Sequence, residues 1–186
     1  MNELQCGRYR LSLERPLLMG IINVTPDSFS GDGLHTDLPC AVAQARRMIE
    51  EGAALLDIGG ESSRPGAPSV SVEDELQRVL PLIAALVDCG VPLSVDTAKP
   101  AVMREALAAG AAMINDINAL RAPGALEAMA QSDAALCLMH MQGEPRTMQN
   151  NPHYEDVVAE VRDFLAARAA AARAAGIAAA RIVIDP

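Results

Sequence analysis

Short apolar runs recur along the chain, and most of them end on a polar residue that opens a loop. Such runs, bounded by Gly, Pro or polar residues, are typical of strands buried in a parallel sheet. The pattern predicts six strands, at residues 17–23, 54–59, 91–96, 112–116, 134–140 and 181–186.

Helical patterns fill the intervals, at about residues 41–51, 71–88, 100–110 and 153–175, and Pro123 opens a further helix. The Ser-Val-Glu-Asp sequence that begins at Ser71 matches a helix-capping pattern. Pro81 falls inside the second helix, so we expect a kink or a local break there. Residues 5–15 alternate around Gly7 and predict a short hairpin that could close the floor of a barrel.

The alternation of strands and helices predicts a single parallel α/β domain over residues 1–186. Polar residues at the carboxyl ends of strands favour the (β/α)8 TIM-barrel type, which builds its active site there. A closed barrel of this type has eight β/α units, and this sequence contains about six of them. We therefore expect part of the barrel to lie outside these residues.

Composition and charge narrow the possible functions. The chain has 186 residues, 51% of them hydrophobic, and a net charge of −9. This charge argues against a general binder of nucleic acid or of membrane surfaces. Four widely spaced cysteines without a C-x-x-C pair predict free thiols in a reducing compartment. The first residues show neither a signal peptide nor a membrane-spanning run, so we expect a cytoplasmic protein.

Asn23 ends the first predicted strand and precedes a long loop that contains Asp27 and Asp32. An amide oxygen beside carboxylates suits Mg²⁺, which takes few protein ligands when a phosphate supplies the rest. The alternative is a turn in which these side chains satisfy backbone groups.

The loop after the second strand carries Ser63, Arg64 and Pro65. Hydroxyl groups and a Pro-Gly turn could hold the Arg64 guanidinium toward an anion. Local sequence alone favours the alternative, a surface arginine in a polar loop.

Asp96, Asn115 and Asp185 lie at the ends of the third, fourth and sixth strands. Carboxylates accept hydrogen bonds, and an amide both donates and accepts, so this set suits a flat heterocycle with amino and ring N–H donors, such as a pterin or a guanine-like base. The alternative is that each residue caps the loop that follows it. His140 ends the fifth strand, and a lone histidine is more often structural than catalytic.

Five motifs, in order, are specific enough to indicate a family. Together they resemble the bacterial dihydropteroate synthases, and the resemblance covers almost the entire chain. The motifs are Met-Gly-Ile-Ile-Asn-Val-Thr-Pro-Asp-Ser-Phe-Ser at 19–30, Asp-Ile-Gly-Gly-Glu-Ser-Ser-Arg-Pro-Gly-Ala at 57–67, Ser-Val-Asp-Thr-Ala-Lys-Pro at 94–100, Ile-Asn-Asp-Ile at 114–117 and Leu-Met-His-Met-Gln-Gly at 138–143.

The resemblance implies a transferase of folate biosynthesis. The amine of p-aminobenzoate would displace pyrophosphate from 6-hydroxymethyl-7,8-dihydropterin diphosphate and give 7,8-dihydropteroate. Mg²⁺-bound pyrophosphate would leave first, and the amine would attack the resulting pterin methylene cation. The partners are therefore small-molecule substrates, and the full-length form is expected to be a homodimer.

The resemblance also assigns roles to residues of the pterin binding domain. Asn23 would contact Mg²⁺ and the diphosphate. The negative charge of Asp96 and Asp185 would favour the pterin methylene cation. We therefore expect Asp96 and Asp185 to serve catalysis, together with Arg64 of the p-aminobenzoate pocket. The expected substrate contacts are Asp96, Asn115 and Asp185 on the pterin ring, Ile117 and Met139 on its faces, and Phe29, Ser63, Arg64 and Pro65 around p-aminobenzoate.

This sequence departs from the family pattern at three points. Ser63 stands where Thr is common and keeps the hydroxyl, whereas a one-residue shift in the first loop moves its acid to Asp32 and weakens any role for it. Family members continue from the sixth strand into two more, which supply a lysine and an Arg-x-His pair. We therefore expect residues 1–186 alone to be poorly stable and nearly inactive.

Two alternative functions stay open. A pterin-dependent methyltransferase uses a similar Asp, Asn and Asp set, although the loop sequences at 19–30 and 57–67 argue against it. A non-catalytic pterin-binding module would bind a pterin without condensing it with an amine.

Overall fold

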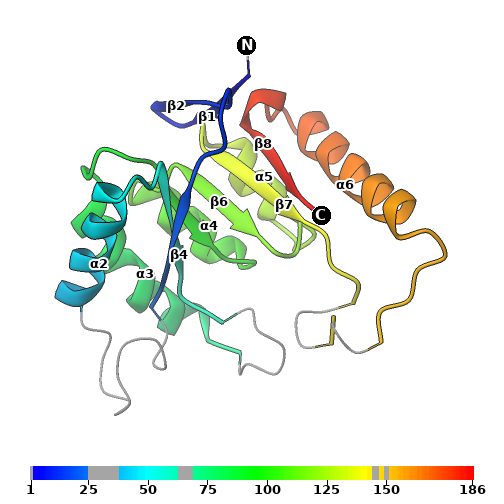
Figure 1. The fold of residues 1–186 in the computed structure, drawn as a ribbon. Coiled ribbons are helices and arrows are strands. Elements are labelled where there is room, and N and C mark those ends of the chain that lie inside the picture. Colours follow the sequence, from blue (N-terminus) through cyan, green and yellow to red (C-terminus); the bar gives the residue numbers. More distant parts are fainter. Residues whose placement is uncertain (1, 25–37, 63–68, 144–146, 149–150) are drawn as a thin grey trace.

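The computed structural model describes residues 2–24, 38–62, 69–143, 147–148 and 151–186. They form a two-stranded antiparallel hairpin and a parallel six-stranded sheet whose strands lie in chain order (Figure 1). The six predicted strands are therefore confirmed. Their bounds are β3 Met19–Asn23, β4 Leu55–Gly59, β5 Leu93–Asp96, β6 Met113–Asp116, β7 Ala135–Met139 and β8 Ile182–Asp185.

Helices cover one face of this sheet, as Figure 1 shows. Alternate strand residues such as Ile22, Ile58 and Ile114 are fully buried there, together with Val79 and Leu165 of the helices. Because this face is built from aliphatic side chains, burial of apolar area is its main source of stability. The helices are α2 Leu38–Glu50, α3 Val72–Leu86, α4 Pro100–Ala108, α5 Ala125–Ala130 and α6 Val157–Ala174, followed by the short 3₁₀ helix η1 Ala179–Arg181.

Two helices bear on the sequence predictions. The predicted cap of α3 is confirmed, since Ser71 Oγ accepts a hydrogen bond from Asp74 N at 3.0 Å. The helix contains Pro81 and continues to Leu86, so it does not break there, and a kink at Pro81 stays a prediction. The fifth predicted helix begins at Val157 rather than near residue 153, because Asp156 caps it by accepting a hydrogen bond from Ala159 N.

The N-terminal hairpin, β1 Glu3–Cys6 and β2 Tyr9–Ser12, packs under the other face of the sheet. Its Leu4 and Cys6 are buried against Leu55, Met113 and Cys137, at the amino-terminal end of the strands (Figure 1). The hairpin thus closes the floor of the sheet's inner face, as predicted.

The sheet is an arc of a barrel in the part of the chain that the structure describes. β3 and β8 are its two edges. Ile21 on β3 is 57% exposed and Ile184 on β8 is 54% exposed, which is unusual for isoleucine in a strand. The observed architecture is therefore the predicted α/β type with six of the eight strands of a TIM barrel.

The turn after β6 holds two consecutive residues in the left-handed conformation, Ala119 at φ 51° and Leu120 at φ 55°. Both are buried, and such conformations cost about 1–3 kcal/mol each for residues other than glycine. The buried Asp116 carboxylate accepts hydrogen bonds from the amides of Asn118 and Leu120, both at 2.7 Å. Arg168 of α6 donates to the carbonyls of Ala119 and Leu120, at 2.7 and 2.9 Å. These bonds offset the strain and fix the turn.

Replacing Arg168 with Ala should lower the free energy of unfolding by about 2 kcal/mol, because two carbonyls of the strained turn lose their charged donor. Urea unfolding followed by circular dichroism measures this. Arg162→Ala is the matched control on the same helix, where an exposed arginine pairs with its neighbour Asp163, and the expected loss is below about 0.5 kcal/mol. Equal losses in the two variants would contradict this role for Arg168.

Candidate active site

The inner face of the sheet, which the helices leave uncovered, carries a row of polar residues at the carboxyl ends of the strands. Asn23 pairs in register with Gly59, Gly59 with Asp96, and Asp96 with Asn115. Because side chains alternate along a strand, all four residues face away from the buried helical core. The structure therefore brings three of the predicted site residues, Asn23, Asp96 and Asn115, into one row across four strands.

Asp96 is the acid of this row. Burial, followed by the negative charges of Asp57, Glu75, Asp116 and Glu61, raises the pKa of Asp96 to about 7. The carboxylate is thus poised to change charge near neutral pH, which is a frequent property of functional residues. An added hydrogen-bond donor or positive charge would stabilise its ionised form.

Asp57 lies two residues before Gly59, on the same inner face of β4, and pairs in register with Ser94 of β5. Its Oδ2 accepts a hydrogen bond from Asn115 Nδ2 at 3.1 Å. This contact orients the Asn115 amide, so that its oxygen remains available to a ligand. Burial raises the pKa of Asp57, against the opposing effects of the Ser94 hydroxyl and the Asn115 amide.

Two buried oxygens beside Asn115 lack a hydrogen-bond partner among the described residues. They are Asp57 Oδ1 and Ser94 Oγ, which are neighbours across β4 and β5 but do not meet hydrogen-bond geometry. Unpaired buried polar atoms are costly, so these oxygens suit a polar ligand or an ordered water.

Asn23 ends β3 at the exposed edge of the row. A Cβ atom on Gly59 would lie 2.9 Å from Asn23 Oδ1 and 3.9 Å from Asp96 Oδ2, so the glycine leaves space between these two side chains. One amide oxygen in an open space fits Mg²⁺, which takes few protein ligands and completes its shell with phosphate and water. No cluster of three or more His, Cys, Asp or Glu side chains in the described residues could hold a metal by itself.

Asp185 lies at the exposed end of β8, beyond the row. It pairs with Met139 on β7, and its carbonyl accepts a hydrogen bond from His140 N at 2.9 Å. β7 separates Asp185 from Asn115, so the predicted trio spans four strands.

The ring of His140 packs edge-on against Phe164 at 5.1 Å, which agrees with a structural rather than a catalytic histidine.

The remaining predicted residues have different outcomes. Ile117 follows β6 and Met139 ends β7, and both are half-buried. Their contact with a ligand stays a prediction. Phe29, Asp32, Ser63, Arg64 and Pro65 lie outside the described residues.

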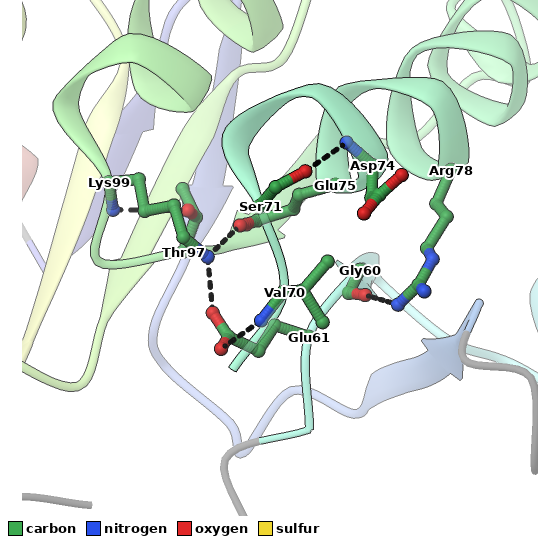
Figure 2. Close-up of polar contacts among 9 residues, drawn as sticks. All are labelled: Gly60, Glu61, Val70, Ser71, Asp74, Glu75, Arg78, Thr97 and Lys99. Carbon is green, nitrogen blue, oxygen red and sulfur yellow. Dashed lines mark hydrogen bonds and ion pairs between the residues drawn. The ribbon is translucent and has the colours of Figure 1, made fainter. Parts of the chain in front are cut away.

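Sequence reasoning missed Asp57, Ser94 and a charged group formed by Glu61, Glu75 and Lys99 (Figure 2). The Lys99 ammonium contacts both glutamates, and Glu75 is completely buried. The available signal for Asp57 was its position inside the apolar run at 54–59, because an acid in a buried strand must face a polar part of the protein. No local pattern pairs a lysine with glutamates 38 and 24 residues away.

Similarity to known proteins agrees with this geometry. The family model described as pterin binding enzyme matches residues 19–186. The chain is 52% identical over 177 residues to the dihydropteroate synthase of Escherichia coli (strain K12), which covers 95% of this chain and 63% of that protein. The chain thus spans about two thirds or less of the relatives that it matches.

Two solved structures share the fold. Burkholderia cenocepacia dihydropteroate synthase complexed with 7,8-dihydropteroate has a TM-score of 0.89 and 58% identity, and the match covers 99% of this chain and 62% of that one. Xanthomonas albilineans dihydropteroate synthase with 4-aminobenzoic acid has a TM-score of 0.90 and 57% identity, with coverages of 100% and 66%. In the described part of this chain, no helix is long and apolar enough to cross a membrane. The chain belongs to the pterin binding enzyme family and is similar, within it, to the bacterial dihydropteroate synthases.

Proposed function

We propose that the protein is a dihydropteroate synthase, which condenses 6-hydroxymethyl-7,8-dihydropterin diphosphate with p-aminobenzoate and releases pyrophosphate. The observation that carries the proposal is the row of Asn23, Asp96 and Asn115 on the uncovered face of the sheet. The relatives of known structure bind 7,8-dihydropteroate and 4-aminobenzoic acid, a product and a substrate of this reaction.

The pterin ring would bind across β5 and β6. Its amino and ring N–H groups would donate to the Asp96 carboxylate and to the Asn115 oxygen, which Asp57 orients by accepting from the other side of the amide. Asp185 would reach the ring from β8. The unpaired oxygens of Asp57 and Ser94 support a polar ligand or water at this position.

The charge of the site suits the proposed chemistry. Loss of pyrophosphate develops positive charge on the pterin methylene, and Asp96, Asp57 and Asp185 lie on the same face of the sheet. Fixed negative charges in a partly dry site stabilise a developing cation more strongly than water does. Arg64 is proposed to act on p-aminobenzoate. A homodimer of the full-length form is also a proposal.

Mg²⁺ is the proposed metal, with Asn23 as the residue that would hold it. When bound, the ion would supply positive charge for the departing diphosphate. The open space beside Gly59 and the single amide oxygen support this assignment.

Pyrophosphate release tests the proposed function. The full-length protein, given pterin diphosphate and Mg²⁺, should turn over continuously only when p-aminobenzoate is added, with pyrophosphate and 7,8-dihydropteroate formed in equal amounts. Pterin binding without release would favour the non-catalytic binding module. Absence of pterin binding would contradict both.

Asp96→Asn should have opposite effects on stability and on binding. The folded-state pKa of Asp96, about 7, lies above the ordinary value of 3.8, so the stability that Asp96 contributes is complete below about pH 4 and is lost as pH rises through about 7. Removal of the buried charge should therefore raise the free energy of unfolding at pH 8 by about 2 kcal/mol. Pterin affinity should fall by roughly 1.5–3 kcal/mol, because a charge-assisted hydrogen bond is lost.

Urea unfolding and calorimetric titration with 7,8-dihydropteroate measure the two effects. Glu51→Gln, which removes an exposed acid on the surface, is the control and should change neither. A variant that is destabilised, or one that binds pterin normally, would remove Asp96 from this role.

Pterin affinity of the unaltered protein should rise with pH and level off above about pH 8. The ionised Asp96 accepts hydrogen bonds from the ring, and a pKa of about 7 leaves roughly half of it protonated at neutral pH. Calorimetric titrations between pH 6 and about pH 9 follow this change. In Asp96→Asn the rise should be absent, and an unchanged rise would assign it to another group.

Asn23→Ala should weaken binding of pterin diphosphate about tenfold in the presence of Mg²⁺, because the ion loses its protein ligand. Binding of 6-hydroxymethylpterin, which lacks the diphosphate, should not change. Comparison of the two dissociation constants with and without Mg²⁺ measures the effect. If both ligands weaken equally, Asn23 supports the pterin site and not the metal.

A further inference from the structure

Lys99 is the only lysine in the chain, and it lies in the turn that follows Asp96. Thr97 fixes this turn. Its backbone amide donates to the Asn115 carbonyl at 3.0 Å, and its hydroxyl accepts from Lys99 N at 3.2 Å. The backbone of Lys99 is thus held in a constant position relative to the two pterin-facing residues, Asp96 and Asn115.

The Lys99 ammonium joins Glu61 and Glu75, as Figure 2 shows. Glu75 is fully buried and its Oε1 has no partner among the described residues, so it depends on Lys99 for its charge balance. Glu61 Oε1 accepts a hydrogen bond from Val70 N at 3.0 Å. Lys99 therefore holds the start of the β4–α3 connection at Glu61, and Glu61 in turn holds its end at Val70.

The end of β4 rests directly on α3 at the same place. A Cβ atom on Gly60 would lie 2.8 Å from Val79 Cγ1 and 2.9 Å from Glu75 Cγ, so no larger residue fits. Arg78 Nη1 donates to the Gly60 carbonyl at 2.8 Å (Figure 2). The preceding residue, Gly59, is the register partner of Asp96. Glu75 and Arg78 thus contact the residue that follows the register partner of Asp96.

We propose that Lys99 is a positioning residue of the pterin site: by joining Glu61 and Glu75 it fixes the end of β4 beside Asp96 and balances the acids that surround that carboxylate. The part of the proposal that concerns pterin rests on the proposed function. The bridge itself does not, because it is a property of the protein without ligand.

The charge balance follows from the groups that face Asp96. Burial disfavours a charged Lys99, but its hydrogen bonds and charge contacts with Glu61 and Glu75 outweigh burial and raise its pKa, so it is a permanent cation at neutral pH. Without it, the acids around Asp96 would be uncompensated and Asp96 would ionise at higher pH. The groups are Asp57 on β4, Glu61 after β4, Glu75 on α3, Asp116 on β6 and Cys137 on β7. Lys99 pairs with two of these acids, Glu61 and Glu75, and Asp185 on β8 faces Cys137.

Lys99→Met tests the proposal. Its dissociation constant for 7,8-dihydropteroate at pH 7 should rise about tenfold, and the midpoint of the pH dependence of binding should move up by about one pH unit. Lys99→Arg keeps the charge and should restore the midpoint. The protonation of the ligand itself is the same for every variant, so differences between variants report on the protein.

Two further variants test the proposal even if Lys99→Met does not fold. Glu61→Gln keeps the contact of Lys99 with the buried Glu75 and should weaken pterin binding through the loosened β4–α3 connection, with a midpoint slightly below that of the unaltered protein. The double variant Lys99→Met with Glu75→Gln removes both buried charges and should return the midpoint close to the original value. Arg47→Met, an exposed arginine on α2, is the matched control for the change in net charge and should leave the midpoint in place.

Lysine-selective ¹⁵N labelling of the full-length protein reports on the bridge without any ligand, and the signal that is lost in Lys99→Met is the one that belongs to Lys99. The Nζ signal of Lys99 should titrate at higher pH than that of a free lysine, and Glu61→Gln should lower that pH. An ordinary titration would contradict the bridge. If the bridge is present and the unaltered protein does not bind pterin, the proposed function fails; if it binds pterin and Lys99→Met binds equally well with the same midpoint, the role of Lys99 fails.

Discussion

The parallel register of the six-stranded sheet is the constraint on which the site depends. Asn23, Gly59, Asp96 and Asn115 come from separate strands, and only their alignment places them side by side on the face that the helices leave uncovered. A slip of one residue in any strand would turn its polar residue toward the aliphatic core. The apolar alternation that buries the helical face therefore also orders the polar residues of the other face.

This arrangement concentrates negative charge, and the protein handles the charge in two ways. Asp96 is left with a pKa of about 7, so the unliganded site can hold a proton that a ligand or a cation would displace. Glu75 is balanced by the only lysine of the chain. Sites that favour a bound state over the empty protein commonly reduce stability in this manner. Stability and pterin recognition are thus opposed at Asp96 and supported together at Lys99.

The strands and the row of strand-end residues could be predicted from sequence, because apolar runs that end on Asn or Asp are local signals. Contacts between distant segments could not. The Asn115 amide on β6 donates a hydrogen bond to Asp57 on β4, across β5. Lys99, in the turn after β5, forms an ion pair with Glu75 of α3. The local preference of proline does not decide between a break and a continuous helix, and α3 continues through Pro81 because tertiary packing overrides that preference. The p-aminobenzoate residues predicted from the family resemblance lie outside the described residues, so their placement rests on that resemblance.

A crystal structure of the full-length protein with a bound pterin tests the central claim most directly. The account predicts that the ring lies on the uncovered face of the sheet, within hydrogen-bond distance of the Asp96 carboxylate and of the Asn115 amide, with Asp57 still accepting from Asn115. A ring bound elsewhere, or one that leaves Asp96 and Asn115 without contact, would contradict it.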